Sequence, residues 1–417
     1  MVLDRRWLSL AASGLLVAAA CAGPAATGTP GGGSPTPGST ASATTGATPT
    51  SSVPEGALKE LGAGEGALNL VAWPYYVEDG TTDPNADWVS AWEKSTGCDI
   101  KVTTAGTSDE MFNLMKTGQY DGVSASGDAT LRLIAAKEVA PVNLSLIPNY
   151  ANVFEGLKGK SHNTVNGVPY GVPHGRGANL LMWRTDVVTP DPDSWSVVWE
   201  ANSPYKGNVT AYDAPIYIAD AAVYLMATKP DLGIKDPYAL DDSQFAAAIA
   251  LLEQQKGLIG EYWSDFNKHL TAFKDKTSVV GTTWQAAANA LTKDKVPVKV
   301  TLPKEGSTGW SDTWMISTKA KNPNCMYRFM DHIISPEANA KATVYFGEAP
   351  VSAEGCAEAE KLSPGHCDTF HATDEAYFSK VYYWNTPTKE CIDGRGPICK
   401  DFAEWTAAWT QLRGAAD

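Results

Sequence analysis

Short apolar runs alternate with amphipathic stretches after residue 66. Residues 68–72 form an apolar run, residues 99–103 alternate between apolar and polar positions, and residues 120–126 lead into a turn, so each is predicted to hold a strand. The predicted helices between and after these strands span residues 87–94, 108–116 and 128–136. Strands and helices that alternate at this length indicate βαβ units and a mainly parallel sheet.

A second α/β series follows a turn-rich passage at residues 170–177. Its predicted strands span residues 180–183, 208–212, 278–281 and 298–302, and its predicted helices span residues 216–227 and 241–254. The chain then returns through a predicted strand at 313–317 and helices at 323–334 and 336–345. We therefore predict an α/β fold of two lobes, each a mostly parallel sheet flanked by helices. Lobe 1 would comprise residues 67–172 plus about 312–351, and lobe 2 residues 173–311.

Aromatic and acidic side chains follow several predicted strands directly. In open α/β sheets, ligands bind beyond the carboxyl ends of the strands. The residues at these exits are Trp73, Tyr76, Ser126, Asp128, Asp213, Trp284, Trp310 and Asp312. Trp310 and Asp312 lie two positions apart, so an extended segment would place an indole and a carboxylate on one face, which suits an organic cation. The competing interpretation makes Trp310 a core residue and Asp312 a turn or cap residue.

The N-terminal segment predicts export and membrane anchoring. Arg5 and Arg6 precede an apolar run that ends in three alanines, so residues 1–20 are predicted to be a signal peptide. Cys21 follows these small residues as in a bacterial lipobox, which predicts its lipidation; the alternative is plain secretion with Cys21 discarded. Residues 21–66 are rich in Gly, Ser, Thr and Pro and predict a disordered tether to the anchor.

The remaining cysteines predict disulfide bonds in an exported protein. They are Cys98, Cys325, Cys356, Cys367, Cys391 and Cys399. The short spacings favour pairing Cys356 with Cys367 and Cys391 with Cys399, which leaves Cys98 for Cys325. A zinc site beside His366 is the alternative, but the chain contains no Cys-x-x-Cys pair. We predict no metal site and no cofactor.

The charge balance excludes one class of partner. With 33 Lys and Arg against 47 Asp and Glu, the net charge is −14, whereas nucleic-acid binding needs a basic surface. The 14 Trp exceed ordinary core needs, and such aromatics often line ligand sites. Phe402, Trp405 and Trp409 form a helical stripe in the C-terminal extension, residues 352–417, and this stripe predicts core packing; a surface facing a partner is the alternative.

The chain resembles the spermidine/putrescine-binding family of extracellular solute-binding proteins that serve bacterial ABC importers. The resemblance rests on the opening strand with Trp73-Pro74-Tyr75-Tyr76, on Tyr212-Asp213-Ala214, on Trp310-Ser311-Asp312 and on Gly347-Glu348-Ala349-Pro350. It implies a type II periplasmic-binding-protein-like fold, a membrane permease as partner, and a monomer that captures a polyamine by hinge closure. The residues that it implies for the amine cage are Trp73, Tyr76, Ser126, Asp213, Trp284, Trp310 and Asp312.

Three positions depart from the family pattern. Ile216 stands where a second acid is expected, Asp128 replaces an aromatic, and Arg176 replaces a tryptophan. Arg176 is expected either to pair with Asp128 or Asp213, to face solvent, or to hold a carboxylate of the ligand. In the last case the ligand would be a zwitterion of the amino-acid kind. An extracellular hydrolase that uses Asp213 and Asp312, and metal capture by paired tyrosines, are further alternatives, but no catalytic motif accompanies them.

Overall fold

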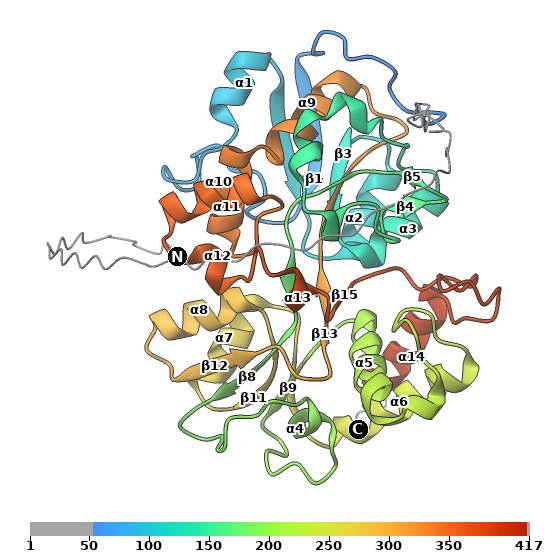
Figure 1. Cartoon of the computed structure of the whole chain (residues 1–417), viewed down its shortest axis with the longest axis vertical. Coiled ribbons are helices and arrows are strands. Elements are labelled where there is room, and N and C mark those ends of the chain that lie inside the picture. Colours follow the sequence, from blue (N-terminus) through green and yellow to red (C-terminus); the bar gives the residue numbers. More distant parts are fainter. Residues whose placement is uncertain (1–52, 415–417) are drawn as a thin grey trace, which may run out of the picture. The chain divides into compact units, whose positions relative to one another are not determined.

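The computed structural model describes residues 53–414. The predicted signal peptide, the lipidation site at Cys21 and most of the predicted tether lie outside these residues. The prediction that the tether continues to residue 66 is wrong, because Gly62 and Glu65 are hydrogen-bonded to Asn324 and Cys325 of lobe 1. The described part has the predicted α/β architecture: two five-stranded sheets, each flanked by helices, form two lobes that are linked by crossing segments (Figure 1).

The sheet of lobe 1 has the strand order β2-β1-β3-β14-β6. Its strands are β1 (Ala67–Ala72), β2 (Asp99–Thr104), β3 (Gly122–Ala125), β6 (Val172–Pro173) and β14 (Thr313–Ile316). β1 runs parallel to β2 and β3, whereas β14 runs antiparallel to β3 and β6. The sheet is therefore parallel at its core and mixed at one side, where the chain returns from lobe 2.

Helices flank this sheet at the predicted places. They are α1 (Ser90–Thr96), α2 (Ser108–Lys116), α3 (Gly127–Ala135), α9 (Pro323–Ile333) and α10 (Pro336–Phe346). α1 begins three residues later than predicted, because the Asp87 carboxylate accepts hydrogen bonds from the backbone of Val89 and Ser90 and thus precedes the helix. Short elements complete the lobe: η1 (Leu144–Leu146), η2 (Pro148–Asn152), η3 (Glu155–Leu157), β4 (Thr164–Val165) and β5 (Val168–Pro169).

The sheet of lobe 2 has the strand order β10-β9-β11-β8-β12. Its strands are β8 (Leu180–Arg184), β9 (Val209–Tyr212), β10 (Ile259–Trp263), β11 (Val280–Thr283) and β12 (Val298–Thr301). β9 runs parallel to β10 and β11, and β8 runs antiparallel to β11 and β12. This sheet is also mixed with a parallel core.

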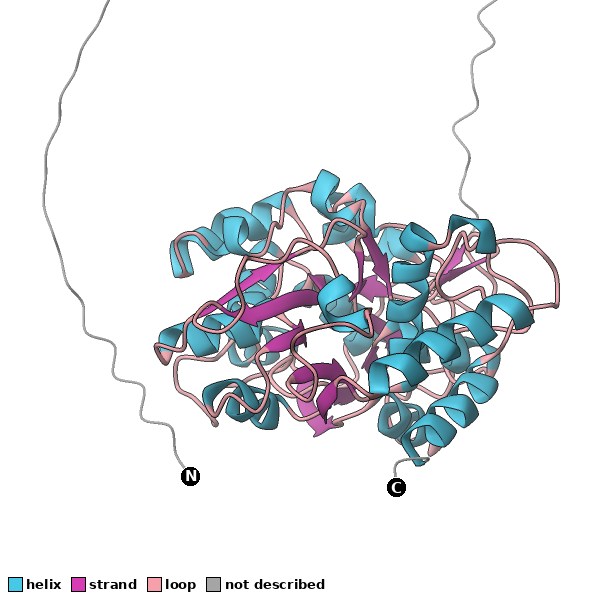
Figure 2. Cartoon of the chain, turned by 90° about the horizontal axis from the view of Figure 1, so that it is seen from below, coloured by secondary structure: helices cyan, strands magenta, loops and turns pink. Residues whose placement is uncertain are grey.

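Helices also flank the strands of lobe 2, and Figure 2 shows strands enclosed by helices when the molecule is seen from below. The helices of lobe 2 are α4 (Ser196–Trp199), α5 (Ile218–Thr228), α6 (Asp242–Lys256), α7 (Phe266–Lys274) and α8 (Gln285–Lys293), with the turns η4 (Pro215–Tyr217) and η5 (Pro230–Leu232). Asp241 caps α6 reciprocally with Gln244, so the helix starts one residue after its predicted first position.

Three strands pair where the chain crosses between the lobes. β7 (Gly177–Ala178) and β15 (Val381–Tyr383) lie on either side of β13 (Ser307–Trp310), antiparallel and parallel to it respectively. Figure 1 shows β13 and β15 between the two lobes. The sequence did not predict β15, because its segment contributes only one short strand whose partner lies more than 70 residues earlier in the chain.

The C-terminal extension packs on both lobes. It contains α11 (Ala353–Leu362), α12 (His366–Thr369), α13 (Glu375–Phe378) and α14 (Phe402–Gly414). Trp405 and Trp409 join the core of lobe 2, which confirms the predicted core stripe at these two positions. Phe402 instead packs against the Arg132 guanidinium of α3 in lobe 1, 4.3 Å from the ring centre. In residues 53–414 no helix has the length and apolarity needed to cross a membrane.

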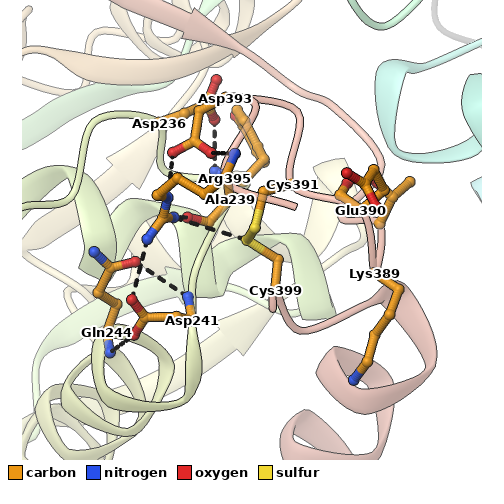
Figure 3. Close-up of a disulfide and its surroundings, with 12 residues drawn as sticks. Asp236, Ala239, Asp241, Gln244, Lys389, Glu390, Cys391, Asp393, Arg395 and Cys399 are labelled. Carbon is orange, nitrogen blue, oxygen red and sulfur yellow. Dashed lines mark hydrogen bonds and ion pairs between the residues drawn. A yellow bond between two sulfur atoms is a disulfide. The ribbon is translucent and has the colours of Figure 1, made fainter. Parts of the chain in front are cut away.

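All three predicted disulfide bonds are present: Cys98 with Cys325, Cys356 with Cys367, and Cys391 with Cys399. Figure 3 shows the last of them, whose loop is fastened to lobe 2 by Arg395. The Arg395 guanidinium donates to Asp241 at 3.0 Å and to the Ala239 carbonyl. No group of three metal-ligating side chains occurs in the described residues, so the zinc alternative has no support there.

Candidate solute-binding site

Asp312 lies between β13 and β14, where the chain returns to lobe 1. Its carboxylate is buried and accepts hydrogen bonds from the hydroxyls of Tyr76 at 2.8 Å and Ser126 at 2.6 Å. Tyr76 follows β1 and Ser126 follows β3, so the strand-exit rule brings three predicted residues together. All three side chains are almost completely shielded from solvent.

The electrostatic setting of Asp312 is unusual. Within residues 53–414, no basic side chain forms an ion pair with it, and its direct partners are neutral hydroxyls. Burial therefore raises the pKa of Asp312 to about 6, although the two hydroxyl hydrogen bonds oppose that rise. A buried carboxylate without a counter-ion is costly, so this site favours the arrival of a cation.

Four aromatic side chains form a closed ring beside this carboxylate. Tyr212, Trp284, Trp310 and Trp384 have neighbouring ring centres 5.5–6.3 Å apart around the circuit. Tyr212 and Trp384 are stacked, with ring planes 21° apart. The negative charge of Asp312 contributes to raising the pKa of the Tyr212 phenol, after burial and Asp128, so the ring and the carboxylate share one electrostatic environment.

Trp284 and Trp310 are held by specific contacts. The Trp284 indole donates to the Asn179 side chain at 3.0 Å and meets Trp310 edge to face. Trp310 lies against the crossing strand β7, where a Cβ at Gly177 would lie only 2.2 Å from the indole. Glycine at position 177 is therefore required for the indole to approach this closely.

Asp128 borders the same region from lobe 1. Asp128 is buried and accepts a hydrogen bond from Ser108 at 2.8 Å, and burial raises its pKa. Its charge contributes to raising the pKa of both Tyr212 and Asp312, so it faces lobe 2. Trp73 is half-buried against the core of lobe 1.

Asp213 is engaged by the C-terminal helix. The Arg413 guanidinium contacts both of its carboxylate oxygens, at 3.0 and 3.2 Å, and the Trp409 indole donates to it at 3.3 Å. The Arg413 guanidinium also lies 3.8 Å from the centre of the Tyr262 ring. Asp213 thus already has a cationic partner within the chain, unlike Asp312.

Arg176 has partners that the sequence did not predict. Its guanidinium is buried, donates to the Ala372 carbonyl and to Glu375 at 2.7 Å each, and stacks 3.9 Å from the Phe378 ring centre. The expectations that it pairs with Asp128 or Asp213, or faces solvent, are therefore wrong. All of these partners belong to the C-terminal extension, so local sequence around Arg176 carried no signal for them.

The site also contains residues that sequence reasoning did not assign. They are Tyr212, Trp384, His174 and Glu348. Tyr212 directly precedes Asp213 at a strand exit and could have been found by that rule. Trp384 lies in the extension, and no periodicity or motif marked it as part of the ring.

Comparison with known proteins agrees with this architecture. The model of the family "Bacterial extracellular solute-binding protein" matches residues 87–363. The chain is 21% identical over 294 residues to spermidine/putrescine-binding periplasmic protein 1 of Haemophilus influenzae (69% of this chain, 76% of that protein). It is 25% identical over 299 residues to the putrescine/cadaverine-binding protein of Pseudomonas aeruginosa (67% and 78%).

Solved structures share the fold at lower sequence identity. The substrate-binding protein of a spermidine/putrescine ABC transporter from Streptococcus pneumoniae superposes with a TM-score of 0.64 at 17% identity, covering 83% of this chain and 97% of that one. The Atu4243-GABA receptor gives a TM-score of 0.60 at 17% identity, covering 83% and 95%. The family model covers more than half of the chain, and the chain therefore belongs to the bacterial extracellular solute-binding proteins.

Proposed function

We propose that this solute-binding protein captures a small organic cation, of the polyamine class that includes putrescine and spermidine, between its two lobes. The observation that carries this proposal is the buried carboxylate of Asp312, which accepts two hydroxyl hydrogen bonds but has no basic partner in the described residues. A ligand ammonium would supply the missing counter-ion through charge-assisted hydrogen bonds.

The aromatic ring supports the same class of ligand. The faces of Trp284, Trp310, Trp384 and Tyr212 attract cations through their quadrupoles, and they also provide apolar surface for methylene groups. Several relatives of this chain are named as polyamine-binding proteins, which is consistent with the proposal. Ser126, Tyr76, Trp73 and Asp128 would complete the wall from lobe 1.

A zwitterion is the second candidate, because a structural neighbour is a GABA receptor. Such a ligand needs a cationic partner for its carboxylate. Arg176 is committed to Glu375, and Arg413 to Asp213. Burial lowers the pKa of His174 to about 3, so this nearby imidazole is neutral and cannot serve. The balance of charge in the site therefore favours a cation, and we assign Arg176 to holding the C-terminal extension.

Hinge closure follows from the burial of the site. Asp312 is only 3% exposed, so a solute can reach it only when the lobes separate. The open form would admit the ligand, and contacts from both lobes would then stabilise the closed form. The ligand would be delivered to a membrane permease.

A thermal-shift screen of amines, amino acids and sugars tests the ligand class. We expect putrescine or spermidine to raise the unfolding midpoint, because a ligand that binds only the folded protein stabilises it. GABA and sugars should have little effect. In Arg176→Met, the ligand-free protein should be less stable, but the affinity for putrescine should change by less than about threefold. A response to GABA alone that disappears in Arg176→Met would instead establish the zwitterion.

Export and anchoring remain a proposal based on the sequence before residue 53. Lipidated Cys21 would attach the protein to the outer face of the membrane. The tether would end before Leu58, because Leu58 packs on the core of lobe 1 and Glu65 accepts hydrogen bonds from Asn324 and Cys325. We expect wild-type protein expressed in a bacterial host to fractionate with membranes, and Cys21→Ser to become soluble. Wild-type protein found in the soluble fraction would refute the anchor.

A further inference from the structure

Glu348 is a buried acid that the proposed site has not yet used. It follows α10 at the start of the segment Glu348–Pro350 and is 0% exposed. Neither of its carboxyl oxygens has a partner within hydrogen-bonding geometry among the described residues. Its nearest donors, the Trp310 indole and the His174 imidazole, do not reach good hydrogen-bond geometry. Buried polar atoms are nearly always satisfied, so this fully buried carboxyl needs an explanation.

The neighbours of Glu348 place it beside Asp312. Burial raises the pKa of Glu348 well above its ordinary range, and the negative charge of Asp312 raises it further, while the Trp310 indole opposes the rise. Both carboxylates also contribute to raising the pKa of the Tyr76 phenol. Tyr76, Trp310 and Asp312 all belong to the proposed site, so Glu348 faces that site.

The remaining neighbour on this side is His174. Its Nδ1 accepts a hydrogen bond from the Trp314 indole at 3.0 Å, so the ring proton of the neutral imidazole is on Nε2. Nε2 points toward Glu348 Oε1 at 3.5 Å, which is too long for a good hydrogen bond. His174 stacks on Tyr76 with ring centres 4.0 Å apart. The imidazole therefore offers a neutral N–H but no positive charge.

The backbone directs Glu348 inward and Arg176 away. Residues 176 and 349 form an antiparallel bridge with backbone hydrogen bonds of 3.1 and 3.0 Å, which fixes the adjacent Glu348 against the crossing segment. A Cβ at Gly175 would lie 2.5 Å from the Glu348 carboxyl carbon, so only glycine leaves room for this acid. The other titratable contact is His366, whose Nε2 meets the Glu348 carbonyl rather than its carboxyl.

We propose that Glu348 is a second ligand carboxylate, which together with Asp312 binds the ammonium groups of a dication. This inference rests on the proposed function and narrows it. The resemblance implies a second acid at the position of Ile216, which is apolar and buried in this chain. Asp213 already forms an ion pair with Arg413. Glu348 supplies the second negative charge from a different element, the segment after α10.

The proposal has two measurable consequences. First, a diamine should bind more tightly than a monoamine of the same chain length, because only the diamine engages both acids. Second, binding should release a proton: burial and the charge of Asp312 favour the protonated form of Glu348, an arriving ammonium favours its ionised form, and the proton passes to the buffer. Asp312, with a pKa of about 6, is already ionised at pH 7.5 and adds little to this release.

Calorimetry with putrescine and n-butylamine tests both consequences in wild type and Glu348→Gln. Titrations at pH 7.5 in phosphate and in Tris, which differ in ionisation enthalpy, count the protons released. We expect wild type to bind putrescine at least about tenfold more tightly than n-butylamine, with release of about one proton. In Glu348→Gln, the putrescine affinity should fall about tenfold and the n-butylamine affinity less than threefold, and proton release should nearly vanish.

Asp220→Asn is the matched control. Asp220 is also a buried acid, and burial raises its pKa to about 8. It accepts a hydrogen bond from Thr308 and is not part of the proposed site. Asp220→Asn should leave the ratio of the two amines unchanged. If Glu348→Gln does not fold, Glu348→Met removes the charge with a side chain of similar length. This inference alone is overturned if wild type binds the amines and both Glu348 variants keep the wild-type ratio of putrescine to n-butylamine affinity and the wild-type proton release. A wild-type protein that binds neither of these amines nor spermidine overturns the proposed function and this inference together.

Discussion

Asp312→Asn is expected to weaken putrescine binding by about a hundredfold at pH 7.5. The substitution keeps the size of the side chain and a hydrogen-bond acceptor for Tyr76 or Ser126, but it removes the negative charge that would pair with a ligand ammonium. Removing one partner of a buried, hydrogen-bonded charge pair leaves the other charge unpaired, which is why the expected loss is large. Titration calorimetry or the quenching of tryptophan fluorescence would measure it.

The pH dependence of binding provides an independent readout for Asp312. With a pKa near 6 in the ligand-free protein, about one in ten of these carboxyls is ionised at pH 5 and nearly all at pH 7.5. In Glu348→Gln, where the proton release assigned to Glu348 is absent, the affinity should therefore be about tenfold lower at pH 5, while putrescine itself stays doubly protonated. This contribution to the pH dependence should be absent in Asp312→Asn.

A folding defect would not mimic these results. The raised pKa of Asp312 means that the ligand-free fold loses free energy of unfolding as the pH rises from about 4 to about 6, because the ionised carboxylate has no cation. Asp312→Asn removes this cost, so its ligand-free stability at pH 7.5 should match or exceed that of wild type. Glu337→Gln, at an exposed acid of α10, is the matched control and should bind normally. Unchanged putrescine affinity in Asp312→Asn would refute the central role of this carboxylate.

The double substitution Cys98→Ala and Cys325→Ala is expected to lower the free energy of unfolding by about 5 kcal/mol. This disulfide joins residues 227 positions apart, and the enclosed chain contains all of lobe 2. In the chain-entropy account, a disulfide stabilises by restricting the unfolded chain, and the restriction grows with the length of the closed loop. Both cysteines are fully buried between β2 and α9, so alanine fits without a new polar group.

Denaturant unfolding of both the mutant and the wild type would measure this effect. Removal of the Cys391 to Cys399 bridge is the control, since those residues are only 8 positions apart. Its expected cost is about 2–3 kcal/mol, because the closed loop is short. Equal losses from the two double mutants would contradict the loop-length argument.

Most of the fold could be predicted from the sequence. Runs such as residues 68–72 are apolar because β1 is covered on both faces, and their alternation with amphipathic helices reveals the βαβ order. The boundaries moved by one to three residues where side chains such as Asp87 cap a helix rather than enter it. The strand β15 escaped prediction because three residues carry too weak a pattern without their distant partner.

The candidate site was predicted in part, since residues at strand exits converge wherever the strands are parallel. This rule placed Tyr76 and Ser126 together with Asp312, as the structure shows. It could not say which acids would remain without a cationic partner. Asp213 at a strand exit and Arg176 in the crossing segment were also predicted to be ligand-binding residues. In the structure, the C-terminal extension pairs each of them with a side chain of opposite charge.

The sequence alone determined the two-lobed α/β class and the three disulfide pairs. It also indicated that Trp310 and Asp312, two positions apart, combine an indole and a carboxylate in one candidate site. These depend on local periodicity, short spacings and a two-residue offset, all of which are written in consecutive residues. Only the tertiary structure decided that Arg413 neutralises Asp213, that Arg176 turns to the extension, and that Glu348 faces Asp312. Each of these contacts joins side chains that are tens to hundreds of positions apart in the sequence. The folded chain brings them together, and no local sequence pattern encodes such a contact.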